Sequence, residues 1–324
     1  MQFKRVSHAI TKALGGQFFT SGVSNSSAGV VVSDSSIQWI ALESQEGHVR
    51  VRAFGEKEMP GGVIVNGRIE NAPMFAQALA DLKRSVGAVE HFHVSVPLRD
   101  AYIFSMQVPA NFSREQIFPI LDYELKRRVP THSSALAYDF KGIAREGERE
   151  EVGVVAFPRE VSESYKTAFE GNGVSVRSVE TGAQSIARAI WSEYGKERTV
   201  LVLDLQEPVA TLIVIKRGVP ICSSYIATGD ANQSVLDEIE RHHRYWDRRR
   251  DAKGRRVTPI EKIVLIGSGA SEELSEKIAA RMRVESVLPN VWRQLFSFEE
   301  HIPSMNHETS LRFATPIGLA LKGF

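Results

Sequence analysis

Two polar turns, at 33–36 and at 204–208, each follow a short apolar run. A turn rich in serine and glycine can present backbone N–H groups and hydroxyls to a phosphate, because unpaired amide dipoles that point into one hollow favour an anion. Ser33 and Gln206, however, stand where a close approach of the backbone favours glycine. Asp34 adds a negative charge that repels a phosphate unless a metal bridges the two. From these residues alone, ordinary hairpin turns in which Asp and Ser bond the local backbone are the simpler interpretation.

A third candidate anion site is the turn formed by Gly267, Ser268 and Gly269, which follows an apolar run ending at Ile266. A helix is expected from about Ser271, and the first amides of a helix have no partner within it. The G-x-G-x-x-G spacing and the P-loop lysine are both absent from this turn, which argues against Rossmann and P-loop chemistry.

A basic run extends from Arg241 to Arg256, with Asp247 and Asp251 as its acids. Such a run can bind phosphates or acidic partners, but a solvated helix end and loop explains it as well. The nine histidines show no H-E-x-x-H or other ligand spacing, so we do not expect a histidine metal site.

The composition excludes several classes of protein. The chain has 324 residues, of which 43% are hydrophobic and 24% charged, as in ordinary folded proteins. A net charge of +1 is too small to attract nucleic acid or membrane through the field of the whole molecule. The apolar runs are far shorter than the roughly 20 residues that cross a bilayer. The single cysteine, Cys222, allows no internal disulfide. We therefore expect a cytoplasmic protein that binds no nucleic acid.

The elements that must position these turns occur twice, as strand, polar turn, strand, strand, helix and strand. The expected ranges are 30–32, 37–42, 48–54, 72–87 and 91–96, and then 200–203, 211–215, 221–226, 234–245 and 262–266. The copies start about 170 residues apart, which favours a duplicated α/β architecture with a cleft between its halves.

Two further segments stand outside the repeat. A small α+β insertion is expected between the copies, with strands at 103–108, 137–140 and 151–156 and helices at 114–127 and 158–171. Residues 1–28 begin with a short amphipathic pattern and continue as a Gly/Ser-rich arm. This segment suits an anionic membrane surface, but a helix so short is marginal alone, and a disordered or partner-ordered arm is the simpler interpretation.

Several segments together resemble one family, the type IV pilus assembly protein PilM. The segment G-V-V-V-S-D-S-S-I-Q-W-I-A-L at 29–42 is similar to the family's opening, usually close to G-L-D-I-G-S-S-S-I-K-V-V-E-L. Other family elements are resembled, in family order, by V-I-V-N-G-R-I-E-N at 63–71, V-L-V-L-D-L at 200–205, I-A-T-G-D at 226–230, I-E-K-I-V-L-I-G-S-G-A at 260–270 and S-L-R-F-A-T-P-I-G-L-A-L-K-G-F at 310–324.

The resemblance implies a fold and a domain organisation. PilM is an actin-like relative of the cell-division protein FtsA, so we expect an α/β, RNase H-like duplicated fold of two lobes. After the arm at 1–28, the first lobe would cover 29–183 and carry an inserted small α+β subdomain at about 98–160. The second lobe would cover 184–324, with a C-terminal helix that returns toward the first lobe.

The resemblance also implies ATP in the cleft, with Mg²⁺ facing Asp204. Carried over by position, the nucleotide-contacting residues would be Ser33, Asp34, Ser35, Ser36, Asp204, Thr211, Gly267, Ser268 and Gly269. The sequence departs from the family at the first aspartate, which is Val31, and at the following glycine, which is Ser33. Because a metal-facing carboxylate is lost and Asp34 adds a charge, we expect a degenerate cleft with weak or absent ATP binding and hydrolysis.

PilM proteins dock onto the cytoplasmic tail of the membrane protein PilN and link the inner-membrane platform to the pilus motors. The resemblance therefore implies a scaffold at the inner face of the cell membrane, peripherally associated through its partners. The family's groove lies between the first lobe and the inserted subdomain, which points to Val65, Asn66, Gly67, Tyr102 and Phe104.

Two alternatives stay open. A kinase of the same superfamily needs a metal site and a general base, and Val31 removes the obvious metal-facing carboxylate. An FtsA-like filament former that binds ATP would carry its membrane-targeting helix at the C-terminus, whereas this sequence stops at Phe324, directly after the family's last helix. Only the N-terminal segment could substitute for it.

Overall fold

The computed structural model describes residues 26–45, 48–97, 101–194, 199–206, 209–227, 232–249, 259–293, 295 and 305–324. The amphipathic segment and nearly all of the arm expected at 1–28 lie outside the described residues, as does the basic run beyond residue 249. Across the described ranges, no helix combines the length and the apolar character needed to cross a membrane.

The first half is built on a five-stranded sheet. Its strands are β1 (Ser26–Val32), β2 (Ser36–Gln45), β3 (His48–Glu58), β6 (His91–Ser95) and β10 (Val176–Glu180), in the order β10-β6-β1-β2-β3. β1, β2 and β3 are antiparallel, whereas β6 runs parallel to both β1 and β10. The central strands are covered on both faces, which is why β1 is almost continuously apolar.

The second half repeats this pattern. Its strands are β11 (Thr199–Leu205), β12 (Val209–Lys216), β13 (Val219–Ala227), β14 (Lys262–Ile266) and β15 (Ser286–Val287), in the order β13-β12-β11-β14-β15. The first three strands are again antiparallel, and the last two run parallel to β11. The duplication expected from the sequence is confirmed, since each strand of one sheet has a counterpart in the other.

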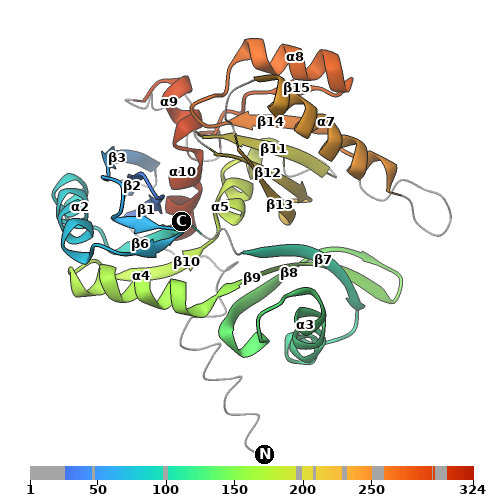
Figure 1. The fold of residues 1–324 in the computed structure, drawn as a ribbon, viewed down its shortest axis with the longest axis horizontal. Coiled ribbons are helices and arrows are strands. Elements are labelled where there is room, and N and C mark those ends of the chain that lie inside the picture. Colours follow the sequence, from blue (N-terminus) through green and yellow to red (C-terminus); the bar gives the residue numbers. More distant parts are fainter. Residues whose placement is uncertain are drawn as a thin grey trace, which may run out of the picture.

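A subdomain is inserted into the first half, between β6 and β10. It contains β7 (Tyr102–Pro109), α3 (Arg114–Arg128), the 3-10 turn η1 (Ser133–Ala135), β8 (Leu136–Glu146) and β9 (Arg149–Pro158). α3 packs on one face of the antiparallel sheet β7-β9-β8 through Ile117 and Leu121. The other face lies against the second half (Figure 1), where a Cβ on Gly153 would come within 2.4 Å of Val219. The insertion thus interrupts the first half but packs on the second.

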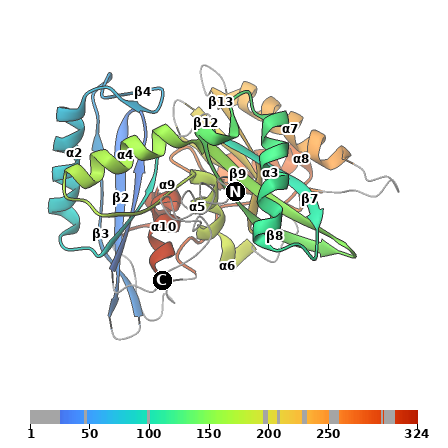
Figure 2. The ribbon, with the colours of Figure 1, turned by 90° about the horizontal axis from the view of Figure 1, so that it is seen from below.

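Paired helices cover the outer face of each sheet (Figures 1 and 2). These are α2 (Ala72–Val86) and α4 (Arg159–Gly171) on the first sheet, and α7 (Asn232–Arg248) and α8 (Glu272–Met282) on the second. The Asn71 side chain caps α2 by accepting a hydrogen bond from Met74 N at 3.1 Å. The shorter elements are β4 (Ile64–Val65), β5 (Arg68–Ile69), α6 (Trp191–Tyr194) and α9 (His307–Arg312).

Two helices lie between the sheets, α5 (Gly182–Ala189) and α10 (Ala314–Ala320), the latter continuing into the 3-10 turn η2 (Leu321–Gly323). A Cβ on Gly318 would lie 1.9 Å from the carbonyl oxygen of Ser185, so α5 and α10 cross in backbone contact. A Cβ on Gly29 would lie 1.9 Å from the carbonyl oxygen of Pro316, so α10 touches β1 equally closely. The domain limit expected after residue 183 falls inside α5, whose apolar residues share one core with the second sheet.

Candidate functional site

The cleft between the two sheets holds a cavity of about 180 Å³. Its polar lining residues are Ser33, Ser95, Thr181, Asp204, Thr211, Ser223, Tyr225 and Thr315. Asp204 is the one charged side chain in this lining, and no lysine, arginine or histidine of the described residues takes part in it. Pockets for drug-sized ligands measure roughly 300–1,000 Å³, so the cavity is small for a nucleotide.

Three of the expected phosphate-contacting residues line this cavity, namely Ser33, Asp204 and Thr211. The last two are direct partners across β11 and β12. Val31, at the position of the family's aspartate, also lines the cavity and gives an apolar wall there. The remaining expected residues are not part of the lining: Asp34, Ser35, Ser36, Gly267, Ser268 and Gly269.

The first turn uses its amides internally. Ser33 Oγ accepts hydrogen bonds from Ser35 N at 3.3 Å and from Ser36 N at 2.9 Å. Ser33 N donates to the carbonyl oxygen of Ser36 at 2.9 Å. These N–H groups are the ones that a phosphate would need, so the turn behaves as a hairpin turn closed by a serine side chain.

Asp34 lies at a neighbouring hairpin. Its Oδ1 accepts a hydrogen bond from Gly67 N at 3.2 Å, in the turn that joins β4 to β5. Burial raises the pKa of Tyr165, and the negative charge of Asp34 raises it further. The carboxylate therefore faces this hairpin instead of the cavity, and the expected repulsion of a phosphate by Asp34 has no basis in the structure.

Asp204 is the next-to-last residue of β11, the central strand of the second sheet, and is partly buried. Burial raises the pKa of Asp204 to about 6, while a hydrogen bond with the Gln206 side chain acts in the opposite direction. A carboxyl that titrates near neutral pH can donate or accept a proton, but one carboxylate makes a poor magnesium site. Elsewhere in the described ranges, no group of three His, Cys, Asp or Glu side chains is placed to hold a metal ion.

The glycine turn after β14 has a packing explanation. Gly267 has a φ of +92°, and a Cβ on it would lie 2.6 Å from the carbonyl oxygen of Leu205. Gly267 N donates to Leu311 O at 3.0 Å, and Gly269 N donates to Leu205 O at 2.9 Å. Ser268 Oγ is 3.4 Å from the same Leu205 oxygen. These residues close the strand end against its neighbours, and the amides of Gly267 and Gly269 are engaged within the protein.

The described residues of the two turns and of the cavity offer few groups to a magnesium nucleotide. The amides of the first turn and of the glycine turn are largely engaged within the protein. The described lining offers one carboxylate and no cationic side chain to a triphosphate. The arrangement suits a small polar or hydrated cavity better than an anion site.

The expected partner-binding residues fall into two groups. Asn66 and Gly67 form the tight turn between β4 and β5, with φ of +51° and +76°. Val65, the last residue of β4, lies beside this turn, and its apolar side chain is 43% exposed. Arg68 forms an exposed ion pair with Glu160, which links the hairpin to the start of α4.

Tyr102 and Phe104 lie on β7, on the face that α3 covers. The Arg128 guanidinium stands 4.7 Å from the centre of the Phe104 ring. Both side chains are partly buried and serve the packing of the subdomain, so they offer a partner less surface than expected. Tyr102 is connected to the hairpin only indirectly. It pairs with Ala156 of β9, and four residues further along the chain Glu160 forms the ion pair with Arg68.

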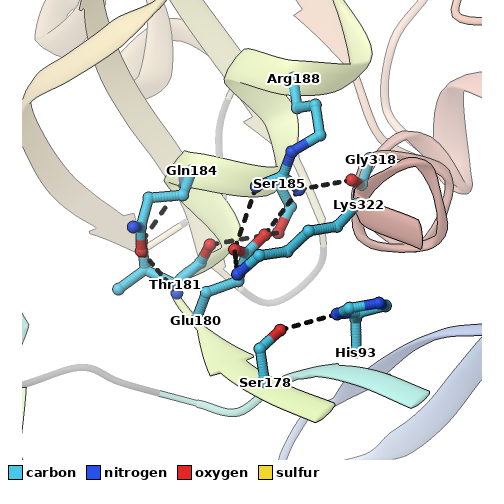
Figure 3. Close-up of polar contacts among 9 residues, drawn as sticks. All are labelled: His93, Ser178, Glu180, Thr181, Gln184, Ser185, Arg188, Gly318 and Lys322. Atoms are coloured by element: carbon cyan, nitrogen blue, oxygen red, sulfur yellow. Dashed lines mark hydrogen bonds and ion pairs between the residues drawn. The ribbon is translucent and has the colours of Figure 1, made fainter. Parts of the chain in front are cut away.

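Sequence reasoning missed a buried charged cluster beside the cleft, formed by Glu180, Arg188 and Lys322 (Figure 3). Burial alone would raise the pKa of Glu180, but the charges of Arg188 and Lys322 lower it to about 2. His93 lies nearby and binds Ser178, and burial lowers the pKa of this histidine to about 3. No spacing rule could have joined these charged residues, because they come from three separate segments.

Comparisons with known proteins agree with this architecture. The family model of the type IV pilus assembly protein PilM matches residues 29–229, more than half of the chain. A solved PilM-PilN type IV pilus biogenesis complex is similar with a TM-score of 0.76 and 16% identity, covering 92% of this chain and 98% of that chain. The ethanolamine utilization protein EutJ from Carboxydothermus hydrogenoformans is similar with a TM-score of 0.49 and 13% identity, covering 93% of each chain. The cytoplasmic domain of EpsL from Vibrio cholerae reaches 0.49 at 11% identity, covering 89% of this chain and 94% of that chain. The expected actin-like fold with an inserted subdomain is confirmed.

Proposed function

The chain belongs to the type IV pilus assembly protein PilM family, and from this premise we propose that it is a scaffold of the pilus assembly platform with a degenerate nucleotide cleft. Its partner is the cytoplasmic tail of a PilN-type membrane protein. The solved relative of the same fold is a PilM-PilN complex, which supports a partner of this type. Further contacts are with platform and motor proteins, and its position is peripheral, at the inner face of the cell membrane.

The observation that carries the degenerate cleft is the closed first turn. Ser33 Oγ occupies the Ser35 and Ser36 amides. Among the described residues that line the cavity behind this turn, Asp204 is the charged one. A phosphate there would face a carboxylate and no lysine, arginine or histidine of the described residues. Weak or absent ATP hydrolysis follows, and the work of the protein is recognition.

The partner tail would bind near the hairpin of Val65, Asn66 and Gly67 and the beginning of β7, at Tyr102 and Phe104. Support comes from the exposure of Val65 and from the ion pair that holds Arg68 in place beside α4. An exposed apolar side chain at the end of a strand, beside a tight turn, offers a partner peptide apolar surface to cover.

The test is a calorimetric titration of the full chain with the cytoplasmic peptide of a PilN-type protein, with and without Mg-ATP. Val65→Glu should weaken binding at least tenfold, since it places a charge at an apolar anchor. Met74→Glu is the matched control, because Met74 is 36% exposed on α2. Equal affinity of Val65→Glu and the unmodified chain would exclude the hairpin, and no binding at all would exclude the partner.

The enzymatic alternatives are tested separately. A phosphotransfer assay across sugars and carboxylic acids, and an ATPase assay, should both give no activity above background. Activity that is lost in Asp204→Asn would favour the kinase or an ATP-using FtsA-like protein, because Asp204 is the one described cleft residue able to act as a base.

A further inference from the structure

Glu180, Arg188 and Lys322, hereafter the interlobe clamp, join β10, α5 and η2 (Figure 3). Arg188 donates to both carboxylate oxygens of Glu180, at 2.8 and 3.0 Å. Lys322 Nζ lies 3.0 Å from Glu180 Oε2, and Ser185 Oγ donates to Oε1 at 2.8 Å. Each oxygen of the carboxylate therefore receives two donors.

Two of the three members of the clamp are buried, and Arg188 is partly buried. Glu180 is 0% exposed and Lys322 is 2% exposed. Arg188 also donates to the carbonyl oxygen of Gly318 at 2.5 Å, which ties α5 directly to α10. Ion pairs in such a place are costly to break one member at a time, because the remaining charge is left without a partner in a medium of low polarity.

The clamp joins a strand of the first sheet to two helices that share the core of the second sheet. β10 is an edge strand of the first sheet, and α10 packs on β1 of that sheet through Gly29. The apolar side of α5 packs in one core with the second sheet. The ion pairs from Glu180 of β10 to Arg188 of α5 and to Lys322 of η2 therefore fasten the first sheet to the core of the second half.

The same helices form part of the cleft wall. Thr181, Gly182 and Ile186 of the α5 segment line the cavity, as does Thr315 of α10. Any change in the angle between the halves must move these residues relative to one another. The clamp therefore restrains the walls of the cleft relative to one another as well as joining the two halves.

We propose that the interlobe clamp holds the two halves in one closed orientation without a ligand, so that the shape of the molecule does not depend on nucleotide. In two-lobed proteins that close around a ligand, contacts with the ligand hold the lobes together. Here the chain supplies such contacts itself, from residues outside the cavity. This inference does not depend on which partner the scaffold binds.

The test measures the distance between the two halves of the full chain by double electron-electron resonance. Spin labels are placed at Gln77→Cys on α2 and Glu276→Cys on α8, both exposed, in a Cys222→Ser background that removes the single native cysteine. The clamp variants are Lys322→Met and the double variant Glu180→Gln with Lys322→Met, which leaves no unpaired carboxylate if the single variant fails to fold. Lys322→Arg is the rescue variant. Lys126→Met, which removes an exposed pair with Asp122 on α3, is the matched control.

We expect one narrow distance distribution for the unmodified chain, for Lys322→Arg and for Lys126→Met, unchanged by Mg-ATP. Both clamp variants should give a broader distribution with a longer mean. An unchanged distribution in the folded clamp variants would overturn the role of the clamp. A distribution of the unmodified chain that shortens or narrows when Mg-ATP is added would overturn its independence of nucleotide.

Discussion

Gly318 allows two helices to cross at the distance of backbone contact, since a Cβ there would lie 1.9 Å from the Ser185 carbonyl oxygen. Backbone atoms cannot move aside as a flexible side chain does. Gly318→Ala should therefore lower the free energy of unfolding by about 3 kcal/mol or more, at the upper end of overpacking effects. Urea unfolding followed by circular dichroism measures this. Gly171→Ala is the control, because nothing lies within 4 Å of its added Cβ. Equal stability of the two variants would contradict the close crossing.

Asp204 makes the stability of the fold depend on pH. Burial raises the pKa of this carboxyl from 3.8 to about 6. Its contribution to stability is therefore fully present below about pH 4 and is lost as the pH rises through 6. As the pH rises from 4 to 7, the free energy of unfolding of Asp204→Asn should therefore increase relative to that of the unmodified chain. The increase is at most about 3 kcal/mol, because the pKa shift is about two units and one unit is worth 1.36 kcal/mol. Denaturant titrations at the two pH values measure it. A constant difference between the two proteins would exclude the burial of this charge.

Single residues also set the limit of sequence-based prediction at the site. Three of the residues carried over from the family, Ser33, Asp204 and Thr211, line one cavity. Family spacing could not reveal that the Ser33 hydroxyl closes its own turn, or that Asp34 reaches Gly67, 33 positions along the chain. Those hydrogen bonds depend on side-chain direction and on a neighbour brought in by the fold, and neither is encoded in residue spacing.

Among the elements, α5 begins with a capping box inside the protein. Gln184 Oε1 accepts from Thr181 N at 3.1 Å, and both residues are buried. Thr181→Ala should cost about 1–2 kcal/mol, because it removes the hydroxyl that accepts from Gln184 N at 3.4 Å and donates to Gln184 Oε1 at 3.0 Å in a buried place. Ser113→Ala at the start of α3 is the exposed counterpart, where water can take over, and should cost less. Thermal unfolding of both variants compares them, and an equal or larger loss in Ser113→Ala would contradict the role of burial.

Element length and burial explain which elements could be predicted. α2, with Phe75, Leu79 and Leu82 on its buried face, was expected to within one residue. α5 was missed because it has only eight residues, about two turns, which is shorter than the window over which a 3.6-residue pattern can be recognised. β15 and the β4–β5 hairpin have strands of two residues, too short for an alternating pattern.

At the scale of the whole molecule, nucleotide should leave the melting temperature unchanged. A ligand present at 100 times its Kd would add about 2.7 kcal/mol to the free energy of unfolding. The cavity is about 180 Å³, and no lysine, arginine or histidine of the described residues lines it. Millimolar Mg-ATP should therefore add far less than this to the free energy of unfolding. Scanning calorimetry with Mg-ATP, and with Mg²⁺ alone as control, measures it. A rise of several degrees that needs ATP would contradict the degenerate cleft.

The wedged position of α10 has a consequence for biosynthesis. β1 touches this helix at Gly29, yet Gly318 leaves the ribosome about 290 residues later, which at about 5–20 residues per second is roughly 15–60 seconds. During that interval the inward side of the first sheet, with Ile40 and Leu42, lacks the segment that finally covers it. Nascent chains of this protein should therefore be clients of the chaperones that shield apolar surface during translation, until the final turn of helix is released and docks.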